Sequence, residues 1–447
     1  MIRVLKPSLL LLLAVPTLAE AAQTEKLVII SNGENVGSIE ATTDGNRVSV
    51  DYAVSDNGRG PKHREEIILG KNGLPTSWTI QGTSLMGGPV QESFRVEAGR
   101  ATWASQADEG SADTATPKLY IANDDSPYAA AVYARVALAA KGGIDTLPGG
   151  RLTVTKVRDM SLGTTPVSIY RLDGSQLAPQ YLALDKKGLL FAVGNAIRVG
   201  NEKDQPAFRK VTVDLARERV KAISEKVAHR YDMPVRIRNV RIFDPLAGKL
   251  GELSTVVVMR DTITQVLPGD GGTVPADQVI IDGEGGTLYP GLHDMHSHTS
   301  LESGLYYLAA GVTGTRDMGN KNSFLLDLLP RVESGEIAGP KIVPNGFLEG
   351  RSPYSARNGF IPETLDEALE NVRWYADHGY REIKIYNSLN PDWVRPVAAE
   401  AHRRGLLVTG HVPAFDSPDR VIADGYDSIA HINQLMLGWL VDETKED

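Results

Sequence analysis

Short runs of alternating apolar and polar residues dominate the chain from about residue 25 to residue 210. Turn signals such as Asn32-Gly33 and Asp173-Gly174 separate these runs. Alternating strands joined by tight turns form antiparallel meanders, so we predict a β-rich domain over residues 22–230, shaped as a curved sheet or half-barrel. Composition and an apolar stripe predict helices at 128–140 and 214–229. No chemical motif occurs here, which favours a structural or substrate-screening role over ligand binding.

The pattern changes twice after residue 230. Three strand-like runs separated by Gly-rich turns fill residues 231–288, and beyond residue 289 apolar strands alternate with helical stretches such as 365–378 and 392–404. The strands predicted in this last part are 312–318, 341–347, 382–387, 406–412 and 428–432. Strands alternating with helices are typical of a parallel sheet covered by helices. A doubly wound sheet and a barrel remain as the alternatives.

The first residues are typical of an export signal. Arg3 and Lys6 precede a short apolar run, and residues 19–21 form an A-x-A cleavage pattern. The apolar run is far shorter than the ~20 residues that a membrane-spanning helix needs. We therefore expect residues 1–21 to be a signal peptide and the protein to be periplasmic or secreted, with no stable membrane span.

Composition restricts the chemistry. The net charge is −9, which does not favour a nucleic-acid partner, because such partners select clustered basic charge. There is no cysteine, which excludes disulfides, thiolate metal sites and cysteine nucleophiles. Seven of the nine histidines follow residue 290. Two of them, His378 and His402, end predicted helices, where a cation stabilises the C-terminus, and His293 is assigned a packing or supporting role.

The other four late histidines lie at the ends of predicted strands. If residues 292–298 form a strand, Asp294, His296 and His298 share one face because side chains alternate. His411 and His431 end two later strands. Catalytic residues of β/α barrels come from the C-terminal ends of several strands. The histidines therefore favour a barrel with a metal site over a doubly wound sheet.

Lys384 gives a second indication of a metal site. In the strand 382–387, Glu382, Lys384 and Tyr386 face the side opposite the isoleucines. If the isoleucines face the helices, Lys384 points into the barrel, where a bare ammonium is costly. One interpretation is a salt bridge between Lys384 and an acid such as Glu382. The other is a carbamate formed with carbon dioxide, whose oxygens can bridge two metal ions.

Several strings in this half carry a resemblance to a known family: TLYPGLHDMHSH, LAAGVTGTRDMG, IAGPKIVPNG, IKIY, GHVP and AHIN. Residues 233–447 resemble the amidohydrolase superfamily, in particular its imidazolonepropionase-like and Xaa-Pro dipeptidase-like branch. The resemblance implies a (β/α)8 TIM-barrel fold over 289–447, preceded over 231–288 by part of a small β-sandwich. Together with the N-terminal antiparallel β-rich domain, the chain is then a multidomain protein.

The resemblance also implies a ligand set for two divalent metal ions, for which imidazole and carboxylate-type oxygens suit zinc. The implied ligands are His296 and His298 on strand 1, Lys384 on strand 4 as the carboxylated bridge, His411 on strand 5 and His431 on strand 6. Tyr386, on the face of Lys384, is a candidate substrate contact. The implied partner is a small-molecule amide or peptide, and the sequence leaves the oligomeric state open.

The implied reaction is hydrolysis of a C–N bond in an amide, a dipeptide or a cyclic amide by a metal-activated hydroxide. Only 16 residues (432–447) follow His431, so we expect an incomplete barrel of about six βα units and a C-terminally truncated chain. The family's catalytic strand-8 aspartate has no candidate, which leaves the activity of this chain in question. Two alternatives stay open: a mononuclear deaminase-type relative, and a non-catalytic periplasmic binding protein with a relic barrel.

Overall fold

The computed structural model describes residues 22–273 and 275–440, so the predicted signal peptide lies outside the described residues. The chain divides into two compact units that meet between Val211 and Thr212. No helix in the described ranges combines the length and the apolar character that crossing a membrane requires.

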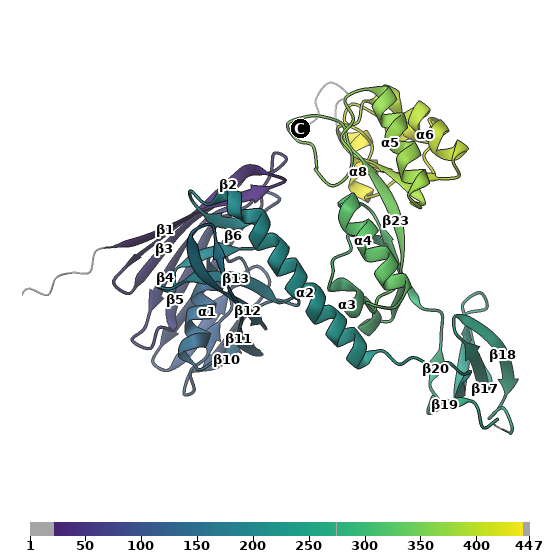
Figure 1. The fold of residues 1–447 in the computed structure, drawn as a ribbon, viewed down its shortest axis with the longest axis horizontal. Coiled ribbons are helices and arrows are strands. Elements are labelled where there is room, and N and C mark those ends of the chain that lie inside the picture. Colours follow the sequence, from purple (N-terminus) through teal and green to yellow (C-terminus); the bar gives the residue numbers. More distant parts are fainter. Residues whose placement is uncertain (1–21, 274, 441–447) are drawn as a thin grey trace, which may run out of the picture. The chain divides into compact units, whose positions relative to one another are not determined.

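The first unit is a fifteen-stranded sheet that curves around a helix (Figure 1). Neighbouring strands are antiparallel apart from β9 and β10, and β1 lies between β2 and β15. The turn between β1 and β2 shows why the chain reverses so tightly. Asn32 and Gly33 have φ values of +50° and +85°, the positive angles of a two-residue hairpin turn that Asn-Gly adopts readily. The predicted antiparallel meander is confirmed.

The strands of this sheet are β1 (Gln23–Ser31), β2 (Glu34–Asp44), β3 (Arg47–Val54), β4 (Lys62–Leu69), β5 (Pro75–Thr83), β6 (Pro89–Glu97), β7 (Arg100–Ala104), β8 (Glu109–Asp113), β9 (Leu119–Tyr120), β10 (Gly143–Leu147), β11 (Arg151–Leu162), β12 (Thr165–Asp173), β13 (Gln180–Asp185), β14 (Leu190–Val193) and β15 (Ala196–Arg198).

The predicted helix at 128–140 is observed as α1 (Ala129–Ala139), which packs against β10–β13 and is buried along most of its length. Small alanine side chains allow this close approach between helix and sheet. A short 3-10 helix, η1 (Glu202–Asp204), leads into α2 (Gln205–Val227), which begins earlier than the predicted 214–229. In the second unit, Val220 of α2 packs with Leu328 and Ile337 in a small apolar cluster.

A small sheet opens the second unit. Its strands are β16 (Val235–Asp244), β17 (Lys249–Met259), β18 (Thr262–Pro268), β19 (Val279–Asp282) and β20 (Thr287–Leu288), in the order β18-β17-β16-β19 with β20 also beside β16. The last of the three strand-like runs predicted in residues 231–288 is divided into two short strands, β19 and β20. Both lie parallel to β16. The Gly-rich turn at 283–286 divides them, with Gly286 donating to the carbonyl of Gly283 at 2.7 Å.

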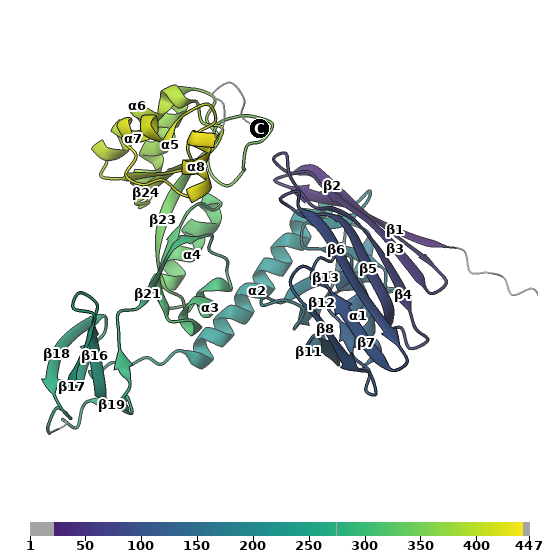
Figure 2. The ribbon, with the colours of Figure 1, turned by 180° about the vertical axis from the view of Figure 1, so that it is seen from behind.

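A five-stranded parallel sheet follows, with its strands in chain order: β21 (Leu292–Ser297), β22 (Val312–Asp317), β23 (Lys341–Leu348), β24 (Glu382–Ile385) and β25 (Leu407–Gly410). Its helices are α3 (Ser303–Ala309), α4 (Asn322–Glu333), α5 (Leu365–Asp377), η2 (Pro391–Trp393), α6 (Val394–Arg403), α7 (Pro418–Ala423) and α8 (Ile432–Leu440) (Figure 2). Val372, Ile383 and Val408 lie in the apolar core of this unit. The predicted alternation of parallel strands and helices is therefore observed.

The strand predicted at 428–432 is not a strand, so the sheet has five strands where about six βα units were predicted. The segment still runs beside β25, because Asp427 and Ser428 donate to the carbonyl of Val408 and Ala430 donates to that of Gly410. His431 then adopts a left-handed φ of +67°, and α8 begins at the next residue. This turn ends the pairing before a strand can form. The sheet in the described residues is open, and the (β/α)8 barrel geometry that the resemblance implies is not confirmed.

Candidate active site

The five predicted metal ligands lie together at one edge of the parallel sheet, at the C-terminal ends of its strands. His296 is in β21 and His298 follows it, Lys384 is in β24, His411 follows β25, and His431 precedes α8. The ring centroids of His296 and His298 are 5.4 Å apart, those of His296 and His431 4.5 Å, and those of His411 and His431 4.7 Å. Parallel strands bring these side chains together because their C-terminal ends share one edge.

Two of the imidazoles are oriented by hydrogen bonds from Nδ1. His298 Nδ1 lies 2.8 Å from the carbonyl oxygen of Gly319, and His411 Nδ1 lies 2.5 Å from Oδ1 of Asn387. Both partners are acceptors, so Nδ1 carries the proton in each ring and Nε2 keeps its lone pair. A ligating histidine usually has such a partner on its second nitrogen. The two rings are therefore in the tautomer that can bind a metal through Nε2.

Two of the site's histidines have lowered pKa values. Burial, followed by the charge of Lys384, lowers the pKa of His296 to about 4. The same two causes, in the same order, lower the pKa of His431. Both imidazoles are therefore neutral at pH 7, and a neutral imidazole is the form that binds metals.

Lys384 is only 1% exposed. Burial lowers its pKa to about 8. The carboxylate of the buried Asp317 acts in the opposite direction, and the nearby Arg316 guanidinium acts in the same direction as burial. In the described ranges no carboxylate lies within ion-pair distance of Lys384. The salt bridge between Lys384 and Glu382, one of the two interpretations from the sequence, is thus absent.

Glu382 has other partners. Its Oε2 lies 2.5 Å from a terminal nitrogen of Arg316 in β22 and accepts from Nδ2 of Asn345 in β23 at 3.1 Å. Arg316 also donates to the hydroxyl of Ser428 at 3.2 Å, just before His431. This polar contact set joins β22, β23, β24 and the 428–431 segment beneath the histidines. Sequence reasoning did not assign a role to Arg316, although the resembling string that contains it was the available signal.

The distances between the imidazole rings are close to those of histidines that bind one metal ion. An imidazole nitrogen lies ~2.1 Å from zinc, which places ring centroids of two ligands on one ion roughly 4.5 to 5.3 Å apart. The 4.7 Å between His411 and His431 lies within this range, and the 5.4 Å between His296 and His298 lies just above it. Among the described residues, however, no three His, Asp or Glu side chains by themselves form a complete metal site.

One predicted feature of the first strand was wrong. Asp294 does not share a face with His296, since its Oδ2 accepts from the hydroxyl of Tyr307 in α3 at 2.8 Å. The register between β21 and β22 shifts between Asp294 and Ser297. An extra residue in a strand reverses the alternation beyond it.

The remaining predicted residues have local roles. Tyr386 follows β24, with its ring 4.1 Å from that of His411, so it borders the site. His378 closes α5, where Nδ1 contacts the carbonyl of Trp374 at 2.7 Å. His402 lies in the last turn of α6, and its Nε2 is 2.9 Å from Oδ2 of Asp427. His293 lies against Gly314, where a Cβ would meet its ring. The interpretation of His378 and His402 as helix-end residues agrees with these positions.

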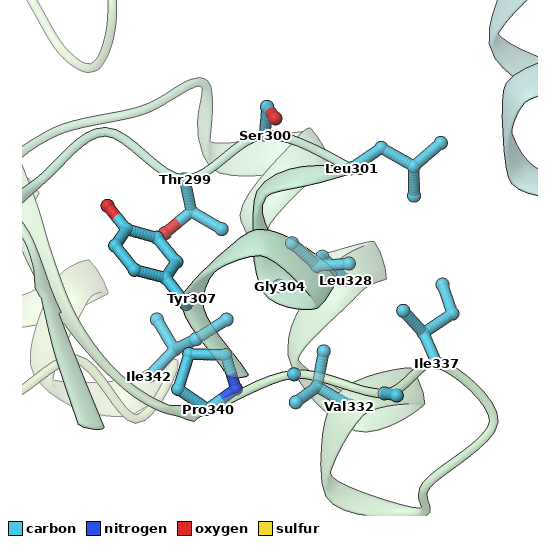
Figure 3. Close-up of a pocket in the computed structure, with 12 residues that line it drawn as sticks. Thr299, Ser300, Leu301, Gly304, Tyr307, Leu328, Val332, Ile337, Pro340 and Ile342 are labelled. Atoms are coloured by element: carbon cyan, nitrogen blue, oxygen red, sulfur yellow. The ribbon is translucent and has the colours of Figure 1, made fainter. Parts of the chain in front are cut away.

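A small pocket lies beside the site and not in it (Figure 3). About 10 Å³ of it is open to the centre of a water molecule, which is room for about one water. Its lining is mostly apolar and comes from residues 299–307, from α4 and from residues 337–342, which lead into β23: Thr299, Ser300, Leu301, Gly304, Tyr307, Leu328, Val332, Ile337, Ala338, Gly339, Pro340 and Ile342.

Comparison with known proteins finds similar structures only. No protein-family profile matches the sequence, and no curated protein matches it. A provisionally named prolidase from Bifidobacterium longum is similar at 25% identity over 45% of this chain and 54% of that chain, with a TM-score of 0.40. An Xaa-Pro dipeptidase with bound methionine is similar at 18% identity over 46% and 64%, with a TM-score of 0.37. Phenylurea hydrolase B is similar at 21% identity over 45% and 60%, with a TM-score of 0.37.

A further similar structure is itself named an amidohydrolase, at 22% identity over 44% of this chain. The names of these structures agree with the predicted resemblance to the amidohydrolase superfamily, and the likeness covers only part of the chain. The chain spans less than two thirds of the length of these structures. Every TM-score is below 0.5, so the likeness assigns no activity, and the argument for function rests on the residues of the site.

Proposed function

We propose that the chain is a metal-dependent amidohydrolase that hydrolyses C–N bonds in amides, dipeptides or cyclic amides. The observation that carries this proposal is the convergence of four imidazoles and one buried lysine at the C-terminal edge of a parallel sheet. A structural histidine usually forms hydrogen bonds with partners of its own. Here three pairs of neighbouring rings have centroids only 4.5 to 5.4 Å apart. Such a cluster has no packing advantage over apolar side chains, which supports a ligand-binding role.

In this proposal His296 and His298 hold one divalent ion, and His411 and His431 hold the second. Lys384 would supply carbamate oxygens as a further ligand, once its neutral amine has formed a bond to the carbon of carbon dioxide and released one proton. The burial of Lys384 supports this step, because a buried ammonium without a carboxylate partner is costly and the neutral amine is the reacting form. Zinc suits a set of imidazole and carboxylate-type ligands.

When bound, such ions polarise a carbonyl and lower the pKa of a coordinated water toward ~7. The chain's own residues prepare the site for this chemistry. Gly319 and Asn387 fix the ring orientations of His298 and His411, so that little reorganisation remains when a ligand arrives. Tyr386 borders the site beside His411 and is proposed to contact the substrate. We further propose export of the protein to the periplasm or exterior after cleavage at Ala21.

The test measures metal content first and hydrolysis second. The full chain is loaded with zinc, and bound metal is quantified for the wild type, His296→Ala and the matched control His293→Ala on the same strand. We expect about two ions per wild-type chain, as in binuclear sites, a clear loss in His296→Ala, and no loss in the control. Equal metal content in all three proteins would contradict the proposal.

Hydrolysis is then measured on a panel of Xaa-Pro dipeptides and N-acyl amino acids. We expect turnover that depends on zinc and is lost in Lys384→Ala, while Lys341→Ala, which removes an exposed lysine of β23, retains it. Full turnover by Lys384→Ala would favour the mononuclear deaminase-type alternative. Tight ligand retention without metal uptake would favour the binding-protein alternative.

A further inference from the structure

The first strand of the parallel sheet contains a β-bulge at His296. Asp294 of β21 pairs with Thr315 of β22, and Ser297 pairs with Asp317. Two residues of β21 therefore lie opposite one residue of β22 in this interval. A bulge of this kind leaves one residue outside the ladder and turns its side chain to a new direction.

The backbone amide of His296 is satisfied by a side chain within the same strand. It donates to Oδ1 of Asp294 at 2.9 Å. The other carboxylate oxygen, Oδ2, accepts from the hydroxyl of Tyr307 at 2.8 Å. The same hydroxyl lies 2.9 Å from Oγ of Ser297. One tyrosine on α3 thus contacts the residues on both sides of the bulge.

These contacts explain how the bulge is held. Asp294 and Ser297 are three positions apart, so in a regular strand their side chains would point to opposite faces. Here both reach Tyr307, because the extra residue reverses the alternation between them. Ser297 is buried, and Tyr307 stands beside Thr299, just past the end of β21 (Figure 3). The hydroxyl therefore stabilises the bulged arrangement over a regular strand.

The bulge directs His296 into the candidate active site. Its ring lies 4.5 Å from that of His431 and 5.4 Å from that of His298. We propose that Tyr307 is a positioning residue, which acts through Asp294 and Ser297 to hold His296 in the orientation that binds metal. This inference rests on the proposed function. It adds to the candidate site a residue whose hydroxyl contacts Asp294 and Ser297 and not the histidines themselves.

The test removes only the hydroxyl, by Tyr307→Phe, in the full chain. The matched control is Tyr306→Phe, which removes the hydroxyl of the neighbouring, more exposed tyrosine of the same helix. Removing a group that supports a ligand weakens metal affinity by roughly 10- to 100-fold. We expect a weakening of about 10-fold for zinc in Tyr307→Phe, measured by competition with a chromophoric chelator. The visible spectrum of the cobalt-substituted protein should change in Tyr307→Phe and stay the same in the control.

A readout on the metal-free chain separates this inference from the proposed function. The backbone amide of His296 should lose protection against hydrogen exchange in Tyr307→Phe and retain it in Tyr306→Phe. Equal protection of this amide in the two variants would overturn the positioning role, whether or not the chain binds metal. Unchanged zinc affinity in Tyr307→Phe would overturn it too. A third outcome separates the two ideas: neither the wild type nor the variants bind metal, but the His296 amide is less protected in Tyr307→Phe than in Tyr306→Phe. The proposed function then fails, whereas the role of Tyr307 in stabilising the bulge is retained.

Discussion

Glu65 makes the stability of the N-terminal unit depend on pH. It projects from β4 onto the inner face of the sheet and is 0% exposed. Its two oxygens accept from the backbone amide of Ser126 at 2.6 Å and from Nε1 of Trp78 at 3.1 Å. Glu65 thereby ties the segment that precedes α1 to the sheet. Burial, only partly offset by these hydrogen bonds, raises the pKa of Glu65 from 4.5 to about 7.

The sign and size of the effect follow from these two pKa values. A carboxyl group with a raised pKa binds its proton more tightly in the folded than in the unfolded state. Its stabilising contribution is therefore complete below pH 4.5 and is lost as the pH rises through about 7. The pKa difference of about 2.5, at about 1.4 kcal/mol for each pKa unit, corresponds to roughly 3 kcal/mol of unfolding free energy. Most of this loss falls between about pH 5 and pH 8.

The perturbation is Glu65→Gln, which keeps the shape of the side chain and removes its titration. Urea unfolding of the full chain is measured at about pH 5 and about pH 8, with a hydrogen-exchange pulse at one fixed pH and mass spectrometry of peptides from β4. Peptides from β4 report the unfolding of the N-terminal unit alone. A single melting curve of a chain with two units does not separate the unfolding of one unit from that of the other. The matched control is Glu66→Gln, the next residue, whose pKa is lowered mainly by the hydrogen bond from Arg47 against the effect of burial.

We expect the wild type and Glu66→Gln to lose stability in this unit between the two pH values, and Glu65→Gln to lose about 3 kcal/mol less. Any change of unfolding free energy with pH that remains in Glu65→Gln is then caused by other titratable groups. If Glu65→Gln and the wild type have the same dependence on pH, the raised pKa of Glu65 is not what destabilises this unit at higher pH, and the reasoning is refuted.

Three further predictions concern the second unit, each checked by thermal or urea unfolding of the full chain. Arg316→Met leaves the carboxylate of Glu382 buried and unpaired, and should cost about 3 to 5 kcal/mol; a loss below about 1 kcal/mol would show that the pair is solvated. Gly350→Ala places a Cβ against the backbone carbonyl of the loop after β24 and should cost about 1 to 3 kcal/mol. Ile383→Ala opens the core between β24 and the helices and should cost about 2 to 5 kcal/mol, whereas Ile422→Ala, at an exposed position, should be nearly neutral.

Local patterns were sufficient to predict most of the fold. Strand alternation with Asn-Gly turns predicted the meander because both signals are local, and the Ala-rich stretch predicted α1. The strand at 428–432 was predicted wrongly because its composition resembles that of β25. Its pairing stops where His431 takes a left-handed φ of +67°. That angle is imposed by the return of the chain into α8, and a local pattern does not contain it.

The positions of the candidate ligands could be predicted, but the groups that orient them could not. His298 and His411 stand out because they end apolar strands. Their partners, the carbonyl of Gly319 and the amide of Asn387, belong to loops after other strands. The bulge at His296 was missed for a related reason. It is set by the pairing of β21 with β22 and by Tyr307 on a separate helix, neither of which is visible in the alternation of β21 alone.

The distribution of charge beneath the site argues against a salt bridge between Lys384 and Glu382. Glu382, Arg316 and Lys384 share this interior layer, and the buried carboxylate of Asp317 also acts on Lys384 and raises its pKa. Glu382 is bound to Arg316 at 2.5 Å and to Asn345 at 3.1 Å. The bound guanidinium and Lys384 have the same sign of charge, and burial together with Arg316 disfavours the ammonium form. A salt bridge to Lys384 would require Glu382 to leave Arg316 as a buried, unpaired cation, which costs more than a neutral amine does. The arrangement therefore lowers the pKa of Lys384 to about 8, which makes the neutral amine, the form that reacts with carbon dioxide, more accessible than in an ordinary lysine.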